Sequence, residues 1–188
     1  MARTGIRAAV AKVVLAQVES FPDARRDQLL RAIPHEVQLA VKDGLSLDWL
    51  DAAEYHLLVN PVFNILGAAE FRSLYTEVYV KLANLPVLSA LTRAALQLGG
   101  VSALGLAKHA PGAWRHLSRG IGELDLISAT HPPHLRYRGY PTHLGPPELF
   151  AYSWAGTFDG FFRLCGSEQT AAITSLDPAT GSATFSLS

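Results

Sequence analysis

Apolar side chains recur at helical spacing in one segment after another over the first 120 residues. A spacing of three and four residues places such side chains on one face of an α-helix. The strongest pattern runs over 61–82, where Pro61 suits the first position of a helix. Further helices are predicted over 6–18, 24–33, 35–44, 47–59, 87–98, 101–110 and 111–119. The first two-thirds of the chain are therefore expected to be almost wholly helical.

Beyond Gly120 the apolar positions alternate with polar ones instead. This period of two, typical of β-strands, runs over 122–130, 134–140, 169–176 and 182–188. Turn-forming residues at 131–133 and 177–181 divide the strands into two antiparallel pairs. The last strand is expected to turn Ala183, Phe185 and Leu187 inward. The pattern predicts an α+β protein that ends in a four-stranded antiparallel sheet, ordered as strand pair, helix, strand pair.

The helix between the two strand pairs is predicted over 146–165 and carries two stripes. Its large side chains are Phe150, Trp154, Phe158, Phe161 and Cys165, and its very small ones are Ser153, Gly156 and Gly160. A stripe of small residues lets another backbone approach closely. Gly156 and Gly160 are therefore predicted to be helix-packing positions.

The large side chains also indicate where a ligand pocket would lie. The helices over 61–82 and 146–165 hold the densest apolar stripes of the chain, and ligand sites tend to be apolar and concave. The predicted lining is Phe71, Leu74, Val78, Trp154, Phe158 and Phe161. The alternative is that these residues fill the core completely, because stripes at helical spacing belong to cores more often than to pockets.

Composition limits the kinds of partner. With 188 residues, 49% of them hydrophobic, we expect one domain over 1–188, helical over 1–120 and sheet-forming over 121–188. Sixteen basic residues balance sixteen acidic ones, without a run rich in Lys or Arg. This balance argues against nucleic acid as a partner.

The low share of charged residues favours an apolar contact surface. Only 17% of residues are charged, and the mean hydropathy is +0.17. The segment 6–18 is apolar on more than one side, and such a helix must be covered. We therefore expect a homodimer whose interface includes Ile6, Val10, Val13 and Val14, with a signalling protein as a further candidate partner.

Location follows from the cysteine content and the lack of long apolar runs. Cys165 has no second cysteine with which to form a disulfide, which favours a reducing compartment. No stretch of eighteen apolar residues is free of charge and proline, so no transmembrane segment is expected. These features predict a cytoplasmic protein.

The histidines are the main candidates for chemistry. His131 and His134 could supply two metal ligands, but two prolines separate them and no acidic or thiolate partner is near in sequence. No G-x-S-x-G motif marks a catalytic serine. We therefore expect no metal, no cofactor and no catalysis. The alternative is a small hydrolase-like or metal-dependent enzyme that uses His131, His134 or His143 with Asp159.

Several motifs resemble an uncharacterised family of cytoplasmic domains abundant in myxobacteria. They include LLRAIPHEVQLAVKDG, ILGAAEFRSLYTEVYVKLA, HLRYRGYP and GTFDGFFRLCGSEQTAAIT. The order of elements is also similar to the fold of vinyl-reductase-type ligand-binding domains and of TRAPP-complex subunits. The resemblance implies a non-enzymatic sensory or adaptor module that dimerises and binds an apolar small molecule. A second implication, by analogy with TRAPP, is contact with a small GTPase.

Overall fold

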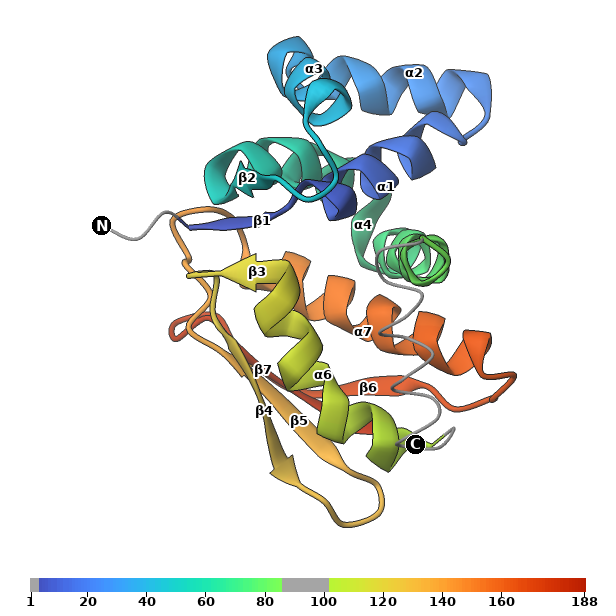
Figure 1. Ribbon diagram of the computed structural model, residues 1–188, viewed down its shortest axis with the longest axis vertical. Coiled ribbons are helices and arrows are strands. Elements are labelled where there is room, and N and C mark those ends of the chain that lie inside the picture. The colour runs from blue at the N-terminus through green and yellow to red at the C-terminus, as the bar shows by residue number, and fades with distance from the viewer. Residues whose placement is uncertain (1–3, 86–101) are drawn as a thin grey trace.

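The computed structural model describes residues 4–85 and 102–188 and has a mixed helical and sheet architecture (Figure 1). The helices are α1 (Ala8–Glu19), α2 (Asp23–Ala32), α3 (His35–Asp43), α4 (Ala52–Ala83), α6 (Ala103–Leu117) and α7 (Pro147–Leu164). The strands are β1 (Gly5–Arg7), β2 (Trp49–Asp51), β3 (Ser118–Arg119), β4 (Glu123–Ser128), β5 (His134–Arg138), β6 (Ala171–Asp177) and β7 (Ser182–Leu187). The predicted helix over 87–98 lies outside the described residues.

The C-terminal part confirms the predicted strand pair, helix, strand pair. Strands β4 and β5 precede α7, β6 and β7 follow it, and all four form one antiparallel sheet in the order β4-β5-β7-β6. Leu135 pairs with Phe185 in the register of β5 and β7. Ala183, Phe185 and Leu187 are buried, as the alternation predicted.

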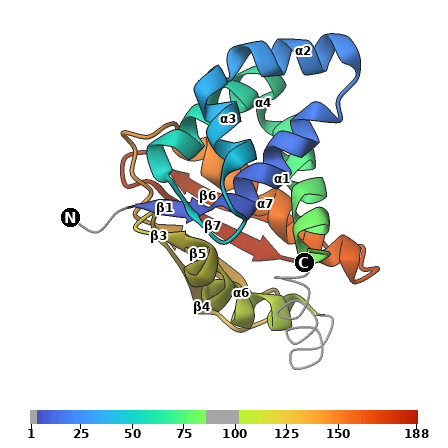
Figure 2. The same cartoon turned by 45° about the horizontal axis from the view of Figure 1, so that its top comes forward.

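Helix α7 lies between the sheet and α4. The Phe158 ring on α7 meets the Phe185 ring on β7 edge to face, with 5.4 Å between centroids. Helix α6 also contacts the sheet, mainly at β4. Helices α1, α2 and α3 gather at the end of the molecule away from this sheet (Figures 1 and 2). The central position of α7 agrees with its two apolar stripes.

A second, three-stranded sheet in the order β2-β1-β3 was not predicted. The helices expected over 6–18 and 47–59 begin later, at Ala8 and Ala52, because the residues before them pair as short strands. The Trp49 ring lies beside two guanidinium groups, with 3.9 Å from the Arg7 carbon Cζ to the ring centroid and 4.5 Å from that of Arg119. These cation–π contacts join all three strands.

Two predicted helix boundaries at prolines are wrong. Helix α4 continues through Pro61 and breaks instead at Gly67, whose φ of 72° and ψ of 175° are not helical. Glycine reaches positive φ without the steric cost of a Cβ atom, so the chain turns there. Helix α6 likewise continues through Pro111. In Figure 1 the two halves of α4 run in different directions.

The predicted dimer residues lie in the chain's own core. Ile6, Val10, Val13 and Val14 are 3%, 6%, 8% and 0% exposed. Helix α1 is covered by α2, α3 and α4 of the same chain. The prediction that these four residues form an intermolecular interface is therefore wrong.

Within 4–85 and 102–188, no helix is both long enough and apolar enough to cross a bilayer.

Candidate functional site

An apolar cavity of about 170 Å³, partly open to the exterior, lies among α4, α6 and α7. Its walls include Tyr55, Tyr75, Val78 and Tyr79 from α4, Leu106, Ala110 and Trp114 from α6, and Phe150, Trp154, Phe158 and Phe161 from α7. Ile6 and Val10 add apolar surface from the N-terminal segment. The lining is therefore mostly aromatic and aliphatic.

Four of the six predicted pocket residues line this cavity. Val78, Trp154, Phe158 and Phe161 do so, whereas Phe71 and Leu74 do not. Both are buried in the core, and the Phe71 ring packs against Tyr75 with 4.8 Å between centroids. The predicted site is thus partly cavity and partly filled core.

Part of the wall that α6 contributes is made of small residues, beside larger ones such as Leu106 and Trp114. Gly105, Ala110 and Ala113 all line the cavity. Large rings from both α6 and α7 pack against one another beside the cavity. The Trp154 ring lies 5.0 Å from Trp114 and 5.3 Å from Phe158, measured between centroids. The sequence prediction missed the α6 wall, although this run of small residues was its signal.

On another side of α7, two glycines form a close contact with α4. A Cβ atom at Gly156 would overlap the Arg72 carbonyl oxygen, and one at Gly160 would lie 2.7 Å from the Thr76 carbonyl oxygen. Real Cβ atoms do not approach backbone oxygens so closely. The glycine stripe therefore lies against α4, the arrangement expected of helix-packing positions.

Several hydroxyl groups of the described lining donate to protein acceptors. Ser153 donates to the Phe150 carbonyl oxygen at 2.9 Å, and Thr157 donates to the Ser153 carbonyl oxygen at 2.8 Å. The Tyr55 and Tyr75 hydroxyls lie 2.5 Å apart. Burial raises the pKa of both phenols, so both stay protonated at neutral pH. These four hydroxyl groups of the described lining are thus neutral.

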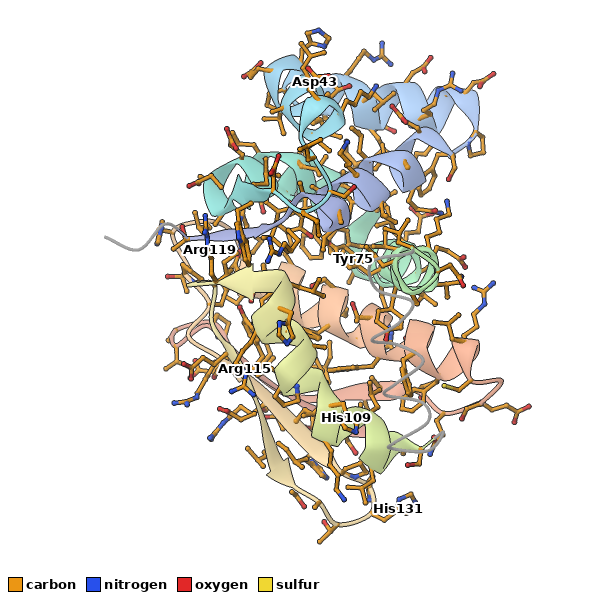
Figure 3. The ribbon with its side chains drawn as sticks, in the orientation of Figure 1. Asp43, Tyr75, His109, Arg115, Arg119 and His131 are labelled. Carbon is orange, nitrogen blue, oxygen red and sulfur yellow. The ribbon has the colours of Figure 1, made fainter. Side chains whose placement is uncertain are left out.

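The titratable residues among the described lining are histidines and tyrosines. His109 and His116 are exposed and lie on α6, where Figure 3 labels His109. Burial raises the pKa of Tyr79 to about 12. Among the described lining residues none is Asp, Glu, Lys or Arg. The described lining residues therefore offer no fixed charge to a bound ion.

Asp159 belongs to a structural junction rather than to a histidine site. Its carboxylate accepts from Arg72 Nε at 2.6 Å and Arg72 Nη2 at 3.0 Å, and from the Ala171 backbone N–H at 3.0 Å. His131 lies in the turn between β4 and β5 (Figure 3). Over the described ranges, no group of three or more His, Cys, Asp or Glu side chains is placed to hold a metal ion. The structure thus does not bring His131, His134, His143 and Asp159 together as such a group.

Cys165 caps the C-terminal end of α7 and is half-buried. Burial raises the pKa of its thiol. A nucleophilic cysteine needs the opposite shift, since the thiolate is the reactive form.

A buried histidine next to the site was not singled out from the sequence. His56 is 2% exposed, and its ring stacks on Phe150 with 5.7 Å between centroids. Its Nδ1–H donates to the Ala52 carbonyl oxygen at 2.5 Å, while its Nε2 has no partner among the described residues. Burial lowers the pKa of this imidazole. His56 is therefore a neutral packing residue behind one wall of the cavity.

Searches with the chain found no matching family model, no matching curated protein and no matching solved structure. The resemblance to myxobacterial domains, to vinyl-reductase-type domains and to TRAPP subunits stays a prediction, as do dimerisation and a GTPase partner. The candidate site is thus defined by its own geometry.

Proposed function

We propose that the chain is a non-enzymatic binding module for a small apolar molecule about the size of one aromatic ring. The observation that carries this proposal is the cavity of about 170 Å³ among α4, α6 and α7. A dry cavity of about 150 Å³ lined by Leu, Ile and Phe is known to take up benzene. Sites for drug-sized ligands and cofactors start at about 300 Å³. Size therefore favours a single-ring ligand over a larger one.

The buried hydroxyls of the lining support binding rather than catalysis, and the two histidines, His109 and His116, lie at exposed positions of α6. A general base or acid needs a group whose protonation changes near neutral pH. Tyr55 and Tyr75 are held protonated, and the Ser153 and Thr157 hydroxyls donate to backbone oxygens. A bound ring would be surrounded by apolar surface and aromatic faces. Such a site is suited to recognition, as in a sensory module.

The experiment is a fluorescence titration with benzene, toluene and ethylbenzene. Trp154 and Trp114 line the cavity, so both indoles should report binding. Trp49 lies on β2 beside Arg7 and Arg119 and supplies a constant background. Binding should appear as a saturable change in emission and as a rise in thermal stability, since the ligand favours the folded state.

Two alanine variants make the assignment specific. Ala110→Leu fills the cavity from α6 and should abolish the saturable signal. Ala69→Leu makes the same replacement at an exposed position of α4 and should leave binding unchanged. Unsaturable emission in wild type, or equal binding by Ala110→Leu, would contradict the proposal.

A further inference from the structure

Two of the three tyrosines that line the cavity, Tyr55 and Tyr75, leave one hydroxyl proton without an acceptor among the described residues. Tyr55 and Tyr75 are 2% and 5% exposed, and each contributes to the cavity wall. Each neutral phenol has one O–H donor. Their single mutual hydrogen bond, 2.5 Å between oxygens, uses one of the two protons. The hydroxyl that accepts this bond still has its own proton to donate.

No other group in the described parts of the chain takes this proton. The pair makes no further hydrogen bond to a described residue. The nearby Tyr140 hydroxyl, which is also buried, likewise lacks a partner among them. A buried donor left without an acceptor costs about 1–3 kcal/mol. A ligand that supplies an acceptor would remove this cost.

We infer that the spare phenolic proton of the Tyr55–Tyr75 pair is donated to the ligand. The ligand class is then a neutral single-ring compound that carries a hydrogen-bond acceptor, such as the carbonyl oxygen of an aromatic ketone or aldehyde. This inference rests on the proposed function and adds one hydrogen bond to the apolar contacts of the ligand.

The surroundings of the pair favour a neutral acceptor over an anion. A carboxylate would lose its hydration on entry, and such desolvation is costly unless a cation compensates for it. The described lining includes no Arg or Lys. A carbonyl oxygen has a much smaller desolvation cost and needs only one donor. A site that holds an unpaired donor rejects analogues that lack the acceptor.

The test compares acetophenone with α-methylstyrene, in which a CH₂ group replaces the carbonyl oxygen at nearly the same shape. Dissociation constants are measured for wild type and for the double variant Tyr55→Phe/Tyr75→Phe. The double variant removes both protons, and replacing both partners of a hydrogen bond by apolar groups is often nearly neutral for stability. The preference for acetophenone should fall about 3- to 10-fold in the double variant, the value of one hydrogen bond.

Tyr79→Phe is the matched control, because Tyr79 also lines the cavity from α4 but lies outside the hydroxyl pair. It should keep the wild-type preference, and loss of the preference in this variant instead would overturn the assignment. An unchanged preference in the double variant would overturn the inference while the proposed function stands. Failure of both compounds to bind wild type would overturn both.

A second measurement needs no variant and covers the case in which the double variant does not fold. The infrared carbonyl stretch of acetophenone bound to wild type should move to lower wavenumber than in hexane, because a donated proton weakens the C=O bond. A stretch at the hexane position would show that no proton reaches the ligand and would overturn the inference.

Discussion

Helix α7 meets α4 and α6 in opposite ways. Towards α4 it presents Gly156 and Gly160, and the two backbones approach until there is no room for a Cβ atom. Towards α6 it presents large rings, and a cavity whose α6 wall includes Ala110 and Ala113 lies between the two helices. A stripe of small residues thus brings α7 close to α4, whereas the large rings that α7 turns towards α6 border a cavity.

The side of α7 that packs against α4, here called the tight side, should be the most sensitive to added volume. In Gly156→Ala the new methyl group would overlap the Arg72 backbone oxygen, which cannot move without shifting α4. We expect a loss of about 3 kcal/mol in the free energy of unfolding, at the upper end for overpacking. Urea unfolding measures it.

Gly112→Ala is the control, since a Cβ atom at Gly112 on α6 would meet nothing within 4 Å. This variant should gain about 0.5–1 kcal/mol, because alanine favours a helix more than glycine does. Equal losses in the two variants would show that helix position alone, and not the α4 contact, sets the cost.

The tight side also contains a polar junction, tested by Asp159→Asn. The variant leaves the Arg72 guanidinium without its carboxylate where the two side chains are 29% and 18% exposed. We expect a loss of about 2 kcal/mol, below the 3–5 kcal/mol of a fully buried pair. Glu70→Gln breaks the more exposed pair with Arg25 and should cost less than about 1 kcal/mol. Similar costs for both variants, measured in urea, would remove the distinction.

On the side of α7 that faces α6 across the cavity, added volume should raise the free energy of unfolding instead of lowering it. Ala110→Leu places apolar atoms in the cavity and should raise the free energy of unfolding by about 1 kcal/mol, as cavity filling often does. Ala107→Leu, on the same helix but 0% exposed and outside the cavity lining, should instead destabilise the protein. If thermal or urea unfolding shows losses for both, the α6 side is close-packed and the comparison fails.

Local periodicity predicted the large elements of this fold but not the contacts made by short ones. The alternation over 122–140 and 169–188 depends on neighbours two residues apart, so it can be read directly from the sequence. Strands β1, β2 and β3 are two or three residues long and exist through pairing between distant segments. Gly5 pairs with Arg119, and no local pattern encodes such a contact. Pro61 was a misleading boundary because α4 continues through it and breaks at Gly67 instead.

The site was half predictable for a related reason. Helical spacing shows which face of α7 is apolar, so Trp154, Phe158 and Phe161 were identified. It does not show how far away the neighbouring helix lies, which is why Phe71 was assigned to a pocket although it is core. The distance between α7 and α6 depends on the side chains of both helices. The Tyr55–Tyr75 hydroxyl pair joins two separate turns of α4, which come together only in the folded chain.

A third region lies beside the first turns of α7, where His56 of α4 is buried without full compensation of its polar atoms. Asp159 on the tight side has a partner for each carboxylate oxygen, whereas His56 stacks on Phe150 with Nε2 unpaired among the described residues. Protonation of Nε2 would create a buried charge and a donor without an acceptor. This cost, with repulsion from His143, is why the pKa of His56 lies below its ordinary value in the folded state.

The smallest expected effect is therefore a pH dependence that His56→Phe removes. As pH falls below about 6.5, the unfolded chain binds a proton at this histidine and the folded chain does not, so stability falls towards the lower folded pKa. Between pH 7 and 5.5, urea unfolding of wild type should lose up to about 1 kcal/mol more than the variant, within the limit of about 1.4 kcal/mol per pH unit for one proton. His35→Gln replaces an exposed histidine on α3, and its pH curve should overlay that of wild type. If the His56→Phe curve overlays wild type as well, the imidazole is solvated or paired in the folded protein, and the buried unpaired nitrogen is refuted.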